Sequence, residues 1–466
     1  MSFLVCLAAL AFLIFVAYRG FSVILFAPIA ALGAVLLTDP SAVLPIYSGL
    51  FMDAMVSFIK NYFPVFMLGA LFGKVIELSG FARSIVSSVI GLLGQGSAML
   101  AITLVGALLT YGGVSLFVVV FAVYPFAAEM FRQGKIPKHL IPGTIALGAF
   151  TFTMDSLPGT PQIQNIIPTT FFNTTSLAAP VLGTIGGVYI LIVGILYLNW
   201  RRKACQAAGE DYAAGDPLVN EPETKEDVKL VNPIIAILPL VLVGIGNIVF
   251  TKYVFPALYT GTVSVTLVDG GKTITQDAAK LLGIWSVEAA LVLGIVTVAV
   301  FAFGTLRDKF IEGSKSAVAG SLLASLNTAS EYGFGSVISS LPGFLVIRDA
   351  LGAIPNPLVN EAITVTTLAG VTGSASGGMG IALAAMADHF KQAADAAGIP
   401  YEVLHRVAAM ASGGMDTLPH NGAVITLLAV TGLTHRQSYR DIFAITCIKT
   451  SAVLVIIAVY YLTGLV

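Results

Sequence analysis

A short motif that occurs twice constrains this chain more than any other feature. Residues 154–161 read Met-Asp-Ser-Leu-Pro-Gly-Thr-Pro, and residues 415–422 read Met-Asp-Thr-Leu-Pro-His-Asn-Gly. Gly-Lys-Val-Ile at 73–76 and Gly-Ser-Val-Ile at 335–338 form a second pair with nearly the same separation. An Ile-Pro pair also precedes the motif by a similar distance in each half. Three landmarks in one order and at one spacing indicate an internal duplication.

Composition indicates that the duplicated unit lies in a membrane. Apolar residues make up 57% of the chain and charged residues 11%, whereas soluble domains typically carry about 25% charged residues. Several apolar runs approach the roughly 20 residues that cross a lipid bilayer as a helix. These runs cover residues 3–17, 21–38, 97–111, 181–199, 234–250, 282–303 and 442–462. We therefore expect an all-α, polytopic membrane protein.

Irregular segments occur at matching places in the two halves. Residues 46–95 and 316–355 are apolar but interrupted by charged residues and glycines, a pattern that favours short or re-entrant helices shielded by protein. Gly-Gly-Val-Ser at 112–115 and Ser-Ala-Ser-Gly-Gly at 374–378 predict one broken helix in each half. Alternating residues around Asp-Gly-Gly predict a small external β-hairpin at about 262–276.

A hydrophilic segment at 201–230 divides the chain and is expected to be a cytoplasmic linker. The first transmembrane repeat is then 1–200 and the second is 231–466. Basic residues favour cytoplasmic loops, which places the loop 131–139 inside and both termini on the periplasmic side. The equivalent loop, 391–405, then lies outside. We therefore expect inverted-topology repeats, an arrangement typical of secondary transporters with a substrate site near the bilayer midplane.

These features together resemble one family of carriers. The length, the paired Asp-(Ser/Thr)-Leu-Pro motifs and the glycine-broken helices resemble the GntP family of gluconate and hydroxy-acid permeases. Leu-Pro-Gly-Thr-Pro-Gln-Ile-Gln-Asn at 157–165 is more similar to its β-hydroxybutyrate permease branch. The resemblance implies an inner-membrane homodimer that imports a small hydroxymonocarboxylate, such as 3-hydroxybutyrate or gluconate, by symport. The coupling ion it implies is H⁺, with Na⁺ as the alternative.

Three acidic residues are candidates for carrying the coupling ion. Carboxyl groups that face lipid are costly, so Asp155, Asp416 and Glu331 should face protein, water or a partner. Each Asp either carries a proton or caps the helix that begins after Leu-Pro. Glu331 has no acidic counterpart in the first half, where Gly69 stands opposite. It is either the coupling carboxylate or a partner in a structural salt bridge.

The candidate substrate site combines glycines, hydroxyl groups and amides. Broken helices expose N-termini whose N–H groups bind anions, although glycine and serine are also common where membrane helices cross closely. Asn327 and Thr328 are expected to add donors from a hairpin tip, and His420 and Asn421 break the symmetry of the motif. His420 either contacts the substrate or is a satisfied internal histidine. The full set is Gly112, Gly113, Ser115, Asn327, Thr328, Ser374, Ser376, Gly377, His420 and Asn421.

Other function classes fit the sequence less well. An intramembrane aspartyl protease is disfavoured because no Gly-x-Gly-Asp occurs at either Asp, and we expect no enzyme. A passive anion channel is the main alternative, because half-helices also line pores. A net charge of −1 does not favour nucleic acid as a partner, and the spacing of the three cysteines predicts neither a disulfide framework nor a metal site.

Overall fold

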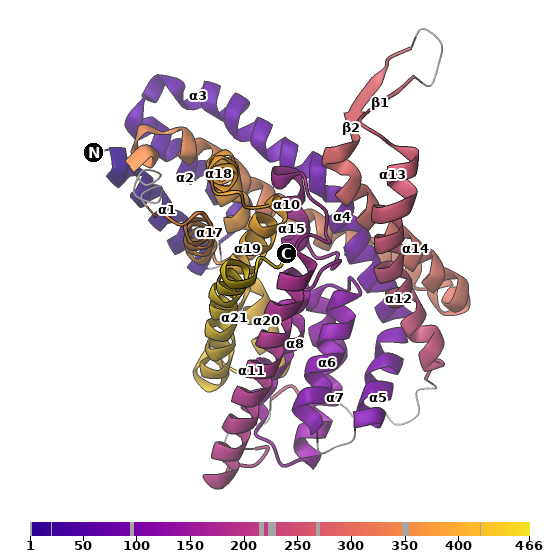
Figure 1. Ribbon diagram of the computed structural model, residues 1–466. Helices are drawn as coiled ribbons and strands as arrows, with labels where there is room; N and C mark the ends of the chain where they lie inside the picture. The colour runs from indigo at the N-terminus through magenta and orange to yellow at the C-terminus, as the bar shows by residue number, and fades with distance from the viewer. Residues whose placement is uncertain are drawn as a thin grey trace.

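The computed structural model of the chain is almost entirely helical (Figure 1). It describes residues 2–19, 21–93, 97–213, 219–221, 230–266, 271–346, 354–419 and 421–466. Five helical stretches are long and apolar enough to cross a membrane. They cover Pro40–Leu78, Pro180–Ala207, Pro233–Leu258, Lys280–Arg307 and His435–Thr463. The expectation of an all-α polytopic protein is confirmed.

The first half contains α1 to α11. Its elements are α1 (Ser2–Tyr18), α2 (Val23–Thr38), a 3₁₀ turn (Pro40–Ala42), α3 (Val43–Ile46), a π-helical turn (Tyr47–Phe51), α4 (Met52–Leu78), α5 (Phe81–Leu93), α6 (Ala98–Tyr111), α7 (Leu116–Gln133), a 3₁₀ turn (Lys138–Leu140), α8 (Ile141–Ala149), α9 (Phe152–Asp155), α10 (Ile163–Phe172) and α11 (Pro180–Ala207). Helix α11 therefore continues into the first residues of the expected linker.

The second half repeats this order with a small sheet inserted. Its elements are α12 (Pro233–Val249), a π-helical turn (Phe250–Val254), α13 (Phe255–Leu258), β1 (Thr262–Val265), β2 (Ile274–Asp277), α14 (Ala278–Arg307), α15 (Phe310–Ser340), α17 (Pro357–Thr372), α18 (Ala375–Ala397), α19 (Tyr401–Gly413), a 3₁₀ turn (Gly414–Thr417), α20 (Gly422–Thr431) and α21 (His435–Thr463). Breaks between α6 and α7 and between α17 and α18 confirm the two broken helices. Both breaks lie where the glycine-rich sequences predicted them.

Equivalent helices of the two halves run antiparallel to each other. Tyr189 and Tyr197 of α11 hydrogen-bond to Ser451 (3.0 Å) and Asp441 (2.8 Å) of α21, so the two helices run in opposite directions. In the other equivalent pair, the residue before α4, Phe51, contacts Gly333 near the end of α15. Equivalent spans that cross the membrane in opposite directions define inverted-topology repeats. This part of the prediction is confirmed.

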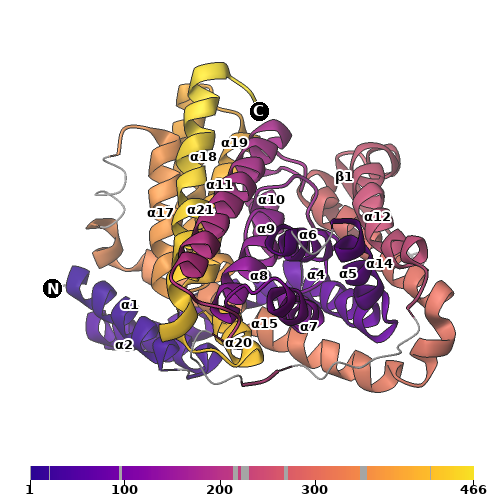
Figure 2. The same ribbon diagram turned by 90° about the horizontal axis from the view of Figure 1, so that it is seen from below.

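The two repeats exchange their first helices. Helices α1 and α2 pack against α15 and α17 of the second repeat, and α12 and α14 pack against α4, α5 and α6 of the first (Figures 1 and 2). Each repeat thus completes the helical layer of the other. The centre of the molecule is consequently built from side chains of both repeats.

Two segments differ from the sequence-based expectation. The segments at 46–95 and 316–355 contain long helices, α4 and α15, rather than only short ones. These two helices pack closely along their length, with Gly313 against Leu78 and Gly333 against Phe51. The expected loop 391–405 is helical except at 398–400.

The expected β-hairpin is present as β1 and β2, with Thr262 opposite Asp277 and Val265 opposite Ile274. Residues 267–270, which include most of its expected turn, lie outside the described residues.

Candidate transport site where the repeats meet

Asp155 of the first motif forms a buried ion pair with the second repeat. Its Oδ2 lies 2.5 Å from Lys449 Nζ of α21, and both side chains are almost fully buried. A Cβ atom at Gly413 would overlap both Asp155 Oδ2 and Lys449 Nζ. Glycine at 413 therefore permits α19 to approach this ion pair, which links the two repeats at the end of α9.

Arg406 of α19 is a second buried cation at the same junction. Its guanidinium donates to the Asp155 carbonyl oxygen (2.6 Å), to Asn165 Oδ1 (2.9 Å) and to the Ala178 carbonyl oxygen (2.6 Å). All three acceptors belong to the first repeat. Neighbouring His405 contacts Thr174 Oγ1 (2.7 Å) and Asn165 Oδ1 (3.3 Å). Arg406 and His405 thereby brace α10 against α19.

Asp416 of the second motif lies at the break between α17 and α18. Its carboxylate accepts hydrogen bonds from Gln164 Nε2 (2.7 Å), the Ala375 N–H (3.0 Å) and Asn421 Nδ2 (3.3 Å). It therefore caps α18, not the helix that follows its own motif. The N-cap of that helix, α20, is Asn421, whose side chain accepts from the Ala423 N–H.

The capping hypothesis is thus wrong for both aspartates. The helix after the first motif, α10, has Gln162 at its N-cap, and Asp155 pairs with Lys449 instead. The sequence does not reveal this because each carboxylate has a partner from the opposite repeat, Lys449 for Asp155 and Gln164 for Asp416.

Glu331 lies in the middle of α15 and faces the start of α18. Its side chain is 5% exposed, and its Oε2 has no hydrogen-bond partner in the described part of the chain. A Cβ atom at Gly377 would overlap that oxygen, so the carboxyl group packs directly against the first turn of α18. Among the described residues no ion pair of Glu331 is found, and its assignment as the coupling carboxylate stays a prediction.

Hydroxyl groups surround this position. Ser376 Oγ lies 3.5 Å from Thr328 Oγ1 and 3.4 Å from Ser374 Oγ. Thr328 is on α15, one turn before Glu331, so these groups form one cluster. Asn327, half-buried beside Thr328 in the middle of α15, does not lie at a hairpin tip as expected. The second break therefore gathers four of the predicted residues around Glu331 (Thr328, Ser374, Ser376 and Gly377).

The backbone N–H groups expected to be free at the breaks are largely engaged. At α18, the Ala375 N–H donates to Asp416 and the Gly377 N–H donates to Ser374 Oγ. At the first break, the Gly112 and Gly113 N–H groups donate to carbonyl oxygens of α6. These N–H groups are therefore not available to a substrate carboxylate, whereas the expectation for the other N–H groups at the starts of α7 and α18 stays a prediction.

The first break is packed mainly by apolar side chains. A Cβ atom at Gly112 would overlap Leu240 of α12, and Gly113 (φ +96°) lies against Pro161 and Leu291. Ser115 is the N-cap of α7 without a side-chain capping bond. Asn421 joins the second break by donating to the Gly373 carbonyl oxygen (2.8 Å), whereas His420 lies outside the described residues.

A cavity of about 600 Å³ lies between α7 and α20. Its lining residues are Phe121, Tyr124, Pro125, Asn220, Ile425, Thr426, Ala429 and Val430. Both helices begin near the motifs and run toward the linker, and Asn220 of the linker forms part of the wall. The equivalent helix pair, α10 and α18, also packs together and is joined next to this contact by the Gln164–Asp416 hydrogen bond.

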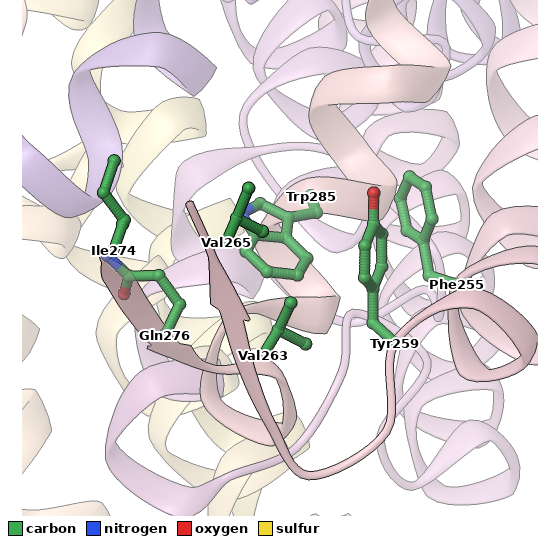
Figure 3. Close-up of a pocket in the computed structure, with 7 residues that line it drawn as sticks. All are labelled: Phe255, Tyr259, Val263, Val265, Ile274, Gln276 and Trp285. Carbon is green, nitrogen blue, oxygen red and sulfur yellow. The ribbon is translucent and has the colours of Figure 1, made fainter. Parts of the chain in front are cut away.

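A second pocket, of about 280 Å³, lies beneath the β-hairpin (Figure 3). Figure 3 shows the rings of Tyr259 and Trp285 facing the strand residues Val263 and Val265. The two rings meet edge to face with centroids 5.3 Å apart. This pocket is apolar, remote from the two motifs, and explained by the packing of the hairpin on α14.

Sequence reasoning missed several buried polar residues. Lys449 was detectable as a lone cation within the apolar run 442–462, since such residues are costly in membranes. Arg406 was hidden in a segment expected to be near a solvated loop. Glu361 of α17 is fully buried, and neither of its carboxyl oxygens has a hydrogen-bond partner in the described part of the chain.

Comparison with known proteins places the chain among transporters. No protein-family model matches it. It is 57% identical over 473 residues to the uncharacterized transporter YxjC of Bacillus subtilis strain 168, with 100% of each chain covered. The chain belongs to the YxjC transporter family.

Two solved transporter structures share the fold of this YxjC relative. The YdaH transporter of Alcanivorax borkumensis aligns with a TM-score of 0.55 and 14% identity, covering 89% of this chain and 88% of YdaH. MtrF of Neisseria gonorrhoeae, described as illuminating a class of antimetabolite efflux pumps, aligns with a TM-score of 0.54 and 11% identity, covering 88% and 83%. At these identities the likeness concerns the fold alone. Neither comparison identifies the GntP family.

Proposed function

We propose that this chain is a secondary active transporter that imports a small hydroxymonocarboxylate, such as 3-hydroxybutyrate or gluconate, together with a proton. The observation that carries the proposal is the buried carboxyl group of Glu331, which has an unpartnered oxygen beside the broken helix α17–α18. Membership of the YxjC transporter family supports transport. The substrate class and the proton come from the resemblance to GntP permeases.

Glu331 is the residue that we assign to the proton. A buried carboxylate without hydrogen-bond donors loses its hydration without compensation, so the neutral acid is favoured. Asp416, which also lies at the start of α18, adds a second negative charge and reinforces this preference. A proton on Glu331 then offsets the charge of an entering substrate anion.

Substrate contacts follow from the same cluster. The protonated Glu331 donates a hydrogen bond to the substrate carboxylate, and the hydroxyl groups of Thr328 and Ser376 are placed to bind its oxygens. Asp155 forms an ion pair with Lys449, and Asp416 accepts hydrogen bonds from Gln164 and the Ala375 N–H, so both carboxylates already have partners in the protein. We therefore propose that these two aspartates position the repeats and that Glu331 alone exchanges the proton.

The arrangement of α7 and α20 supports alternating access. The cavity between these helices is bordered by the linker residue Asn220, whereas the equivalent pair α10 and α18 is bridged beside it through Gln164 and Asp416. In a transporter built from inverted repeats, one conformation has an open helix pair on one side and the equivalent pair closed on the other side. The alternate conformation has the two pairs the other way round. We propose that this conformation opens toward the linker.

The remaining parts of the proposal concern placement in the cell. Basic residues in the linker favour a cytoplasmic location, so the repeats 1–200 and 231–466 would be joined inside. Both termini would then be periplasmic, in a homodimer in the inner membrane. The homodimer is proposed on the basis of the resemblance to GntP permeases.

Uptake into proteoliposomes tests the function. Labelled 3-hydroxybutyrate and gluconate are supplied under an imposed pH gradient without sodium, and accumulation that collapses with a protonophore establishes proton symport. Accumulation only after sodium is added would contradict proton coupling. Equilibration without concentration would identify a passive channel, and no uptake of either label would refute the substrate class.

Glu331→Gln tests the assignment of the proton. We expect the variant to lose gradient-driven accumulation while retaining exchange of labelled for unlabelled substrate, because glutamine keeps the shape of the side chain but cannot release a proton. Glu312→Gln is the matched control, since Glu312 lies on the same helix with an 81% exposed side chain. Concentrative uptake by Glu331→Gln equal to that of the control would disprove the assignment.

A further inference from the structure

We propose that His139, Cys205 and Glu210 form a binding site for a transition-metal ion, with Zn²⁺ as the best match, at the linker end of the first repeat. One ligand atom of each residue lies within 4.8 Å of the other two. His139 Nε2 is 3.8 Å from Cys205 Sγ and 4.0 Å from Glu210 Oε2. Thiolate, imidazole and carboxylate are the three side-chain ligands that zinc uses in proteins.

The distances suit a tetrahedral ion after a small contraction. Zinc bonds of about 2.3 Å to sulfur and about 2.0–2.1 Å to nitrogen or oxygen place sulfur and nitrogen roughly 3.5 Å apart, and nitrogen and oxygen roughly 3.3 Å apart. The observed separations exceed these values by less than an ångström. We expect rotation of the Glu210 and His139 side chains to close that difference.

The local backbone explains why these groups converge. Cys205 lies in the last turn of α11, and the Glu210 N–H donates to the Cys205 carbonyl oxygen (3.0 Å). Gly209 has a φ of +80°, a conformation that glycine adopts without strain, and it turns the chain back over the helix end. His139 comes from the 3₁₀ turn before α8. The site thus joins α8, α11 and the start of the linker.

A second observation points to a ligand at this place. The Glu210 side chain is 40% exposed, but its Oε2 atom is itself buried and has no hydrogen-bond partner in the described part of the chain, which is unfavourable for a carboxylate oxygen. A bound cation would satisfy this oxygen. Three protein ligands leave a fourth position for water, so the site has the composition of an open zinc site.

Metal binding at this site would strengthen the attachment of the linker. The residue before His139, Lys138, forms an ion pair with Glu221 (2.7 Å) and donates to the Val219 carbonyl oxygen (2.6 Å). The linker therefore already returns to the same 3₁₀ turn. The ion would fix a second point of the linker, at Glu210, on the same element.

Cobalt substitution in the purified full-length protein tests the site without a transport assay. After treatment with a chelator, titration with Co²⁺ is expected to give a thiolate-to-cobalt absorption band that saturates at one equivalent and that Zn²⁺ bleaches. Cys205→Ser should abolish the band. His139→Gln and Glu210→Gln should each weaken Co²⁺ binding by more than roughly 100-fold, because replacing a residue that only hydrogen-bonds to a metal ligand already costs roughly 10–100-fold.

Cys447→Ser provides the matched control, because Cys447 is exposed on α21. It should leave the band unchanged. Size-exclusion profiles like that of the unsubstituted protein show that each variant is folded. No band, or a band that survives Cys205→Ser, would overturn the proposal, whatever the outcome of the uptake assays.

Discussion

The Asp155–Lys449 pair offers the sharpest test of how the repeats are held together. Asp155→Asn leaves the Lys449 ammonium buried with the Phe150 carbonyl oxygen (3.2 Å) as its remaining acceptor. Lys449→Met leaves the Asp155 carboxylate with the Ser156 hydroxyl (2.8 Å). Each single substitution thus creates an uncompensated buried charge, which costs about 3–5 kcal/mol of folding free energy.

The double variant separates the ion pair from simple packing. With both charges removed, neither member of this pair is left without the other, and replacing a buried pair by neutral side chains is often nearly neutral for stability. We therefore expect the double variant to be more stable than either single variant. A favourable coupling free energy on the order of 3 kcal/mol would result.

Thermal unfolding of the detergent-purified protein, followed by fluorescence, measures these effects. At about 2 °C per kcal/mol, the low end of the range for larger domains, each single substitution lowers Tm by roughly 6–10 °C. Lys315→Met is the control, because its partner Glu312 and Lys315 itself are largely exposed and surface pairs contribute about 0–1 kcal/mol. Single-variant shifts below about 2 °C, or a double variant that shows the sum of both losses, would refute the reasoning.

Two further predictions concern the start of α18 and the linker. Gly377→Ala should abolish uptake while the protein still folds, because a Cβ there displaces the Glu331 carboxyl group. Gly320→Ala is the control and should transport normally, because a Cβ at Gly320 meets nothing within 4 Å. Equal uptake by both variants would contradict the placement of Glu331. Burial opposes ionisation of Glu221, but its hydrogen bond and ion pair with Lys138 outweigh this and lower the pKa of Glu221. A lowered pKa stabilises the attachment of the linker above the pKa of an unfolded glutamate, near 4.3, and that stabilisation is lost as the pH falls through the folded value. Proteolysis of the linker should therefore accelerate on acidification, and Glu221→Gln should give the fast rate already at pH 7; a slow rate for that variant would show that the charge is not what holds the linker.

Much of the architecture could be predicted from local sequence patterns. Apolar runs define membrane helices because the bilayer requires a fixed apolar length. The glycine-rich sequences predicted breaks because glycine disfavours a continuous helix: the first break lies at Gly112–Gly113, and the second at Gly373–Ser374, just before the helical Gly377 and Gly378. The small sheet followed from strict alternation on both sides of an Asp-Gly-Gly turn. Each of these inferences depends on neighbours within a few residues along the chain.

The candidate site was only partly predictable. Glu331, Ser374 and Ser376 stood out because polar residues are costly within apolar segments, and the structure brings them together. The roles expected for Asp155 and Asp416 as caps of their own helices were wrong. Their actual partners, Lys449, Gln164 and the Ala375 N–H, lie more than 40 residues away in sequence.

The sequence by itself determined that the chain is a duplicated, membrane-spanning helical protein with two broken helices. Repeated motifs, apolar runs and glycine-rich segments can all be recognised from residue identities without knowing which residues are in contact. Only the tertiary structure decided which buried acidic groups are paired and which, such as Glu331 and Glu361, have oxygens without a hydrogen-bond partner among the described residues. The physical reason is the packing of the second repeat against α9 and α10 of the first: it sets Lys449 against Asp155 and Gln164 against Asp416. Glu331 faces the first turn of α18 with an oxygen that has no hydrogen-bond donor among the residues that the structure describes.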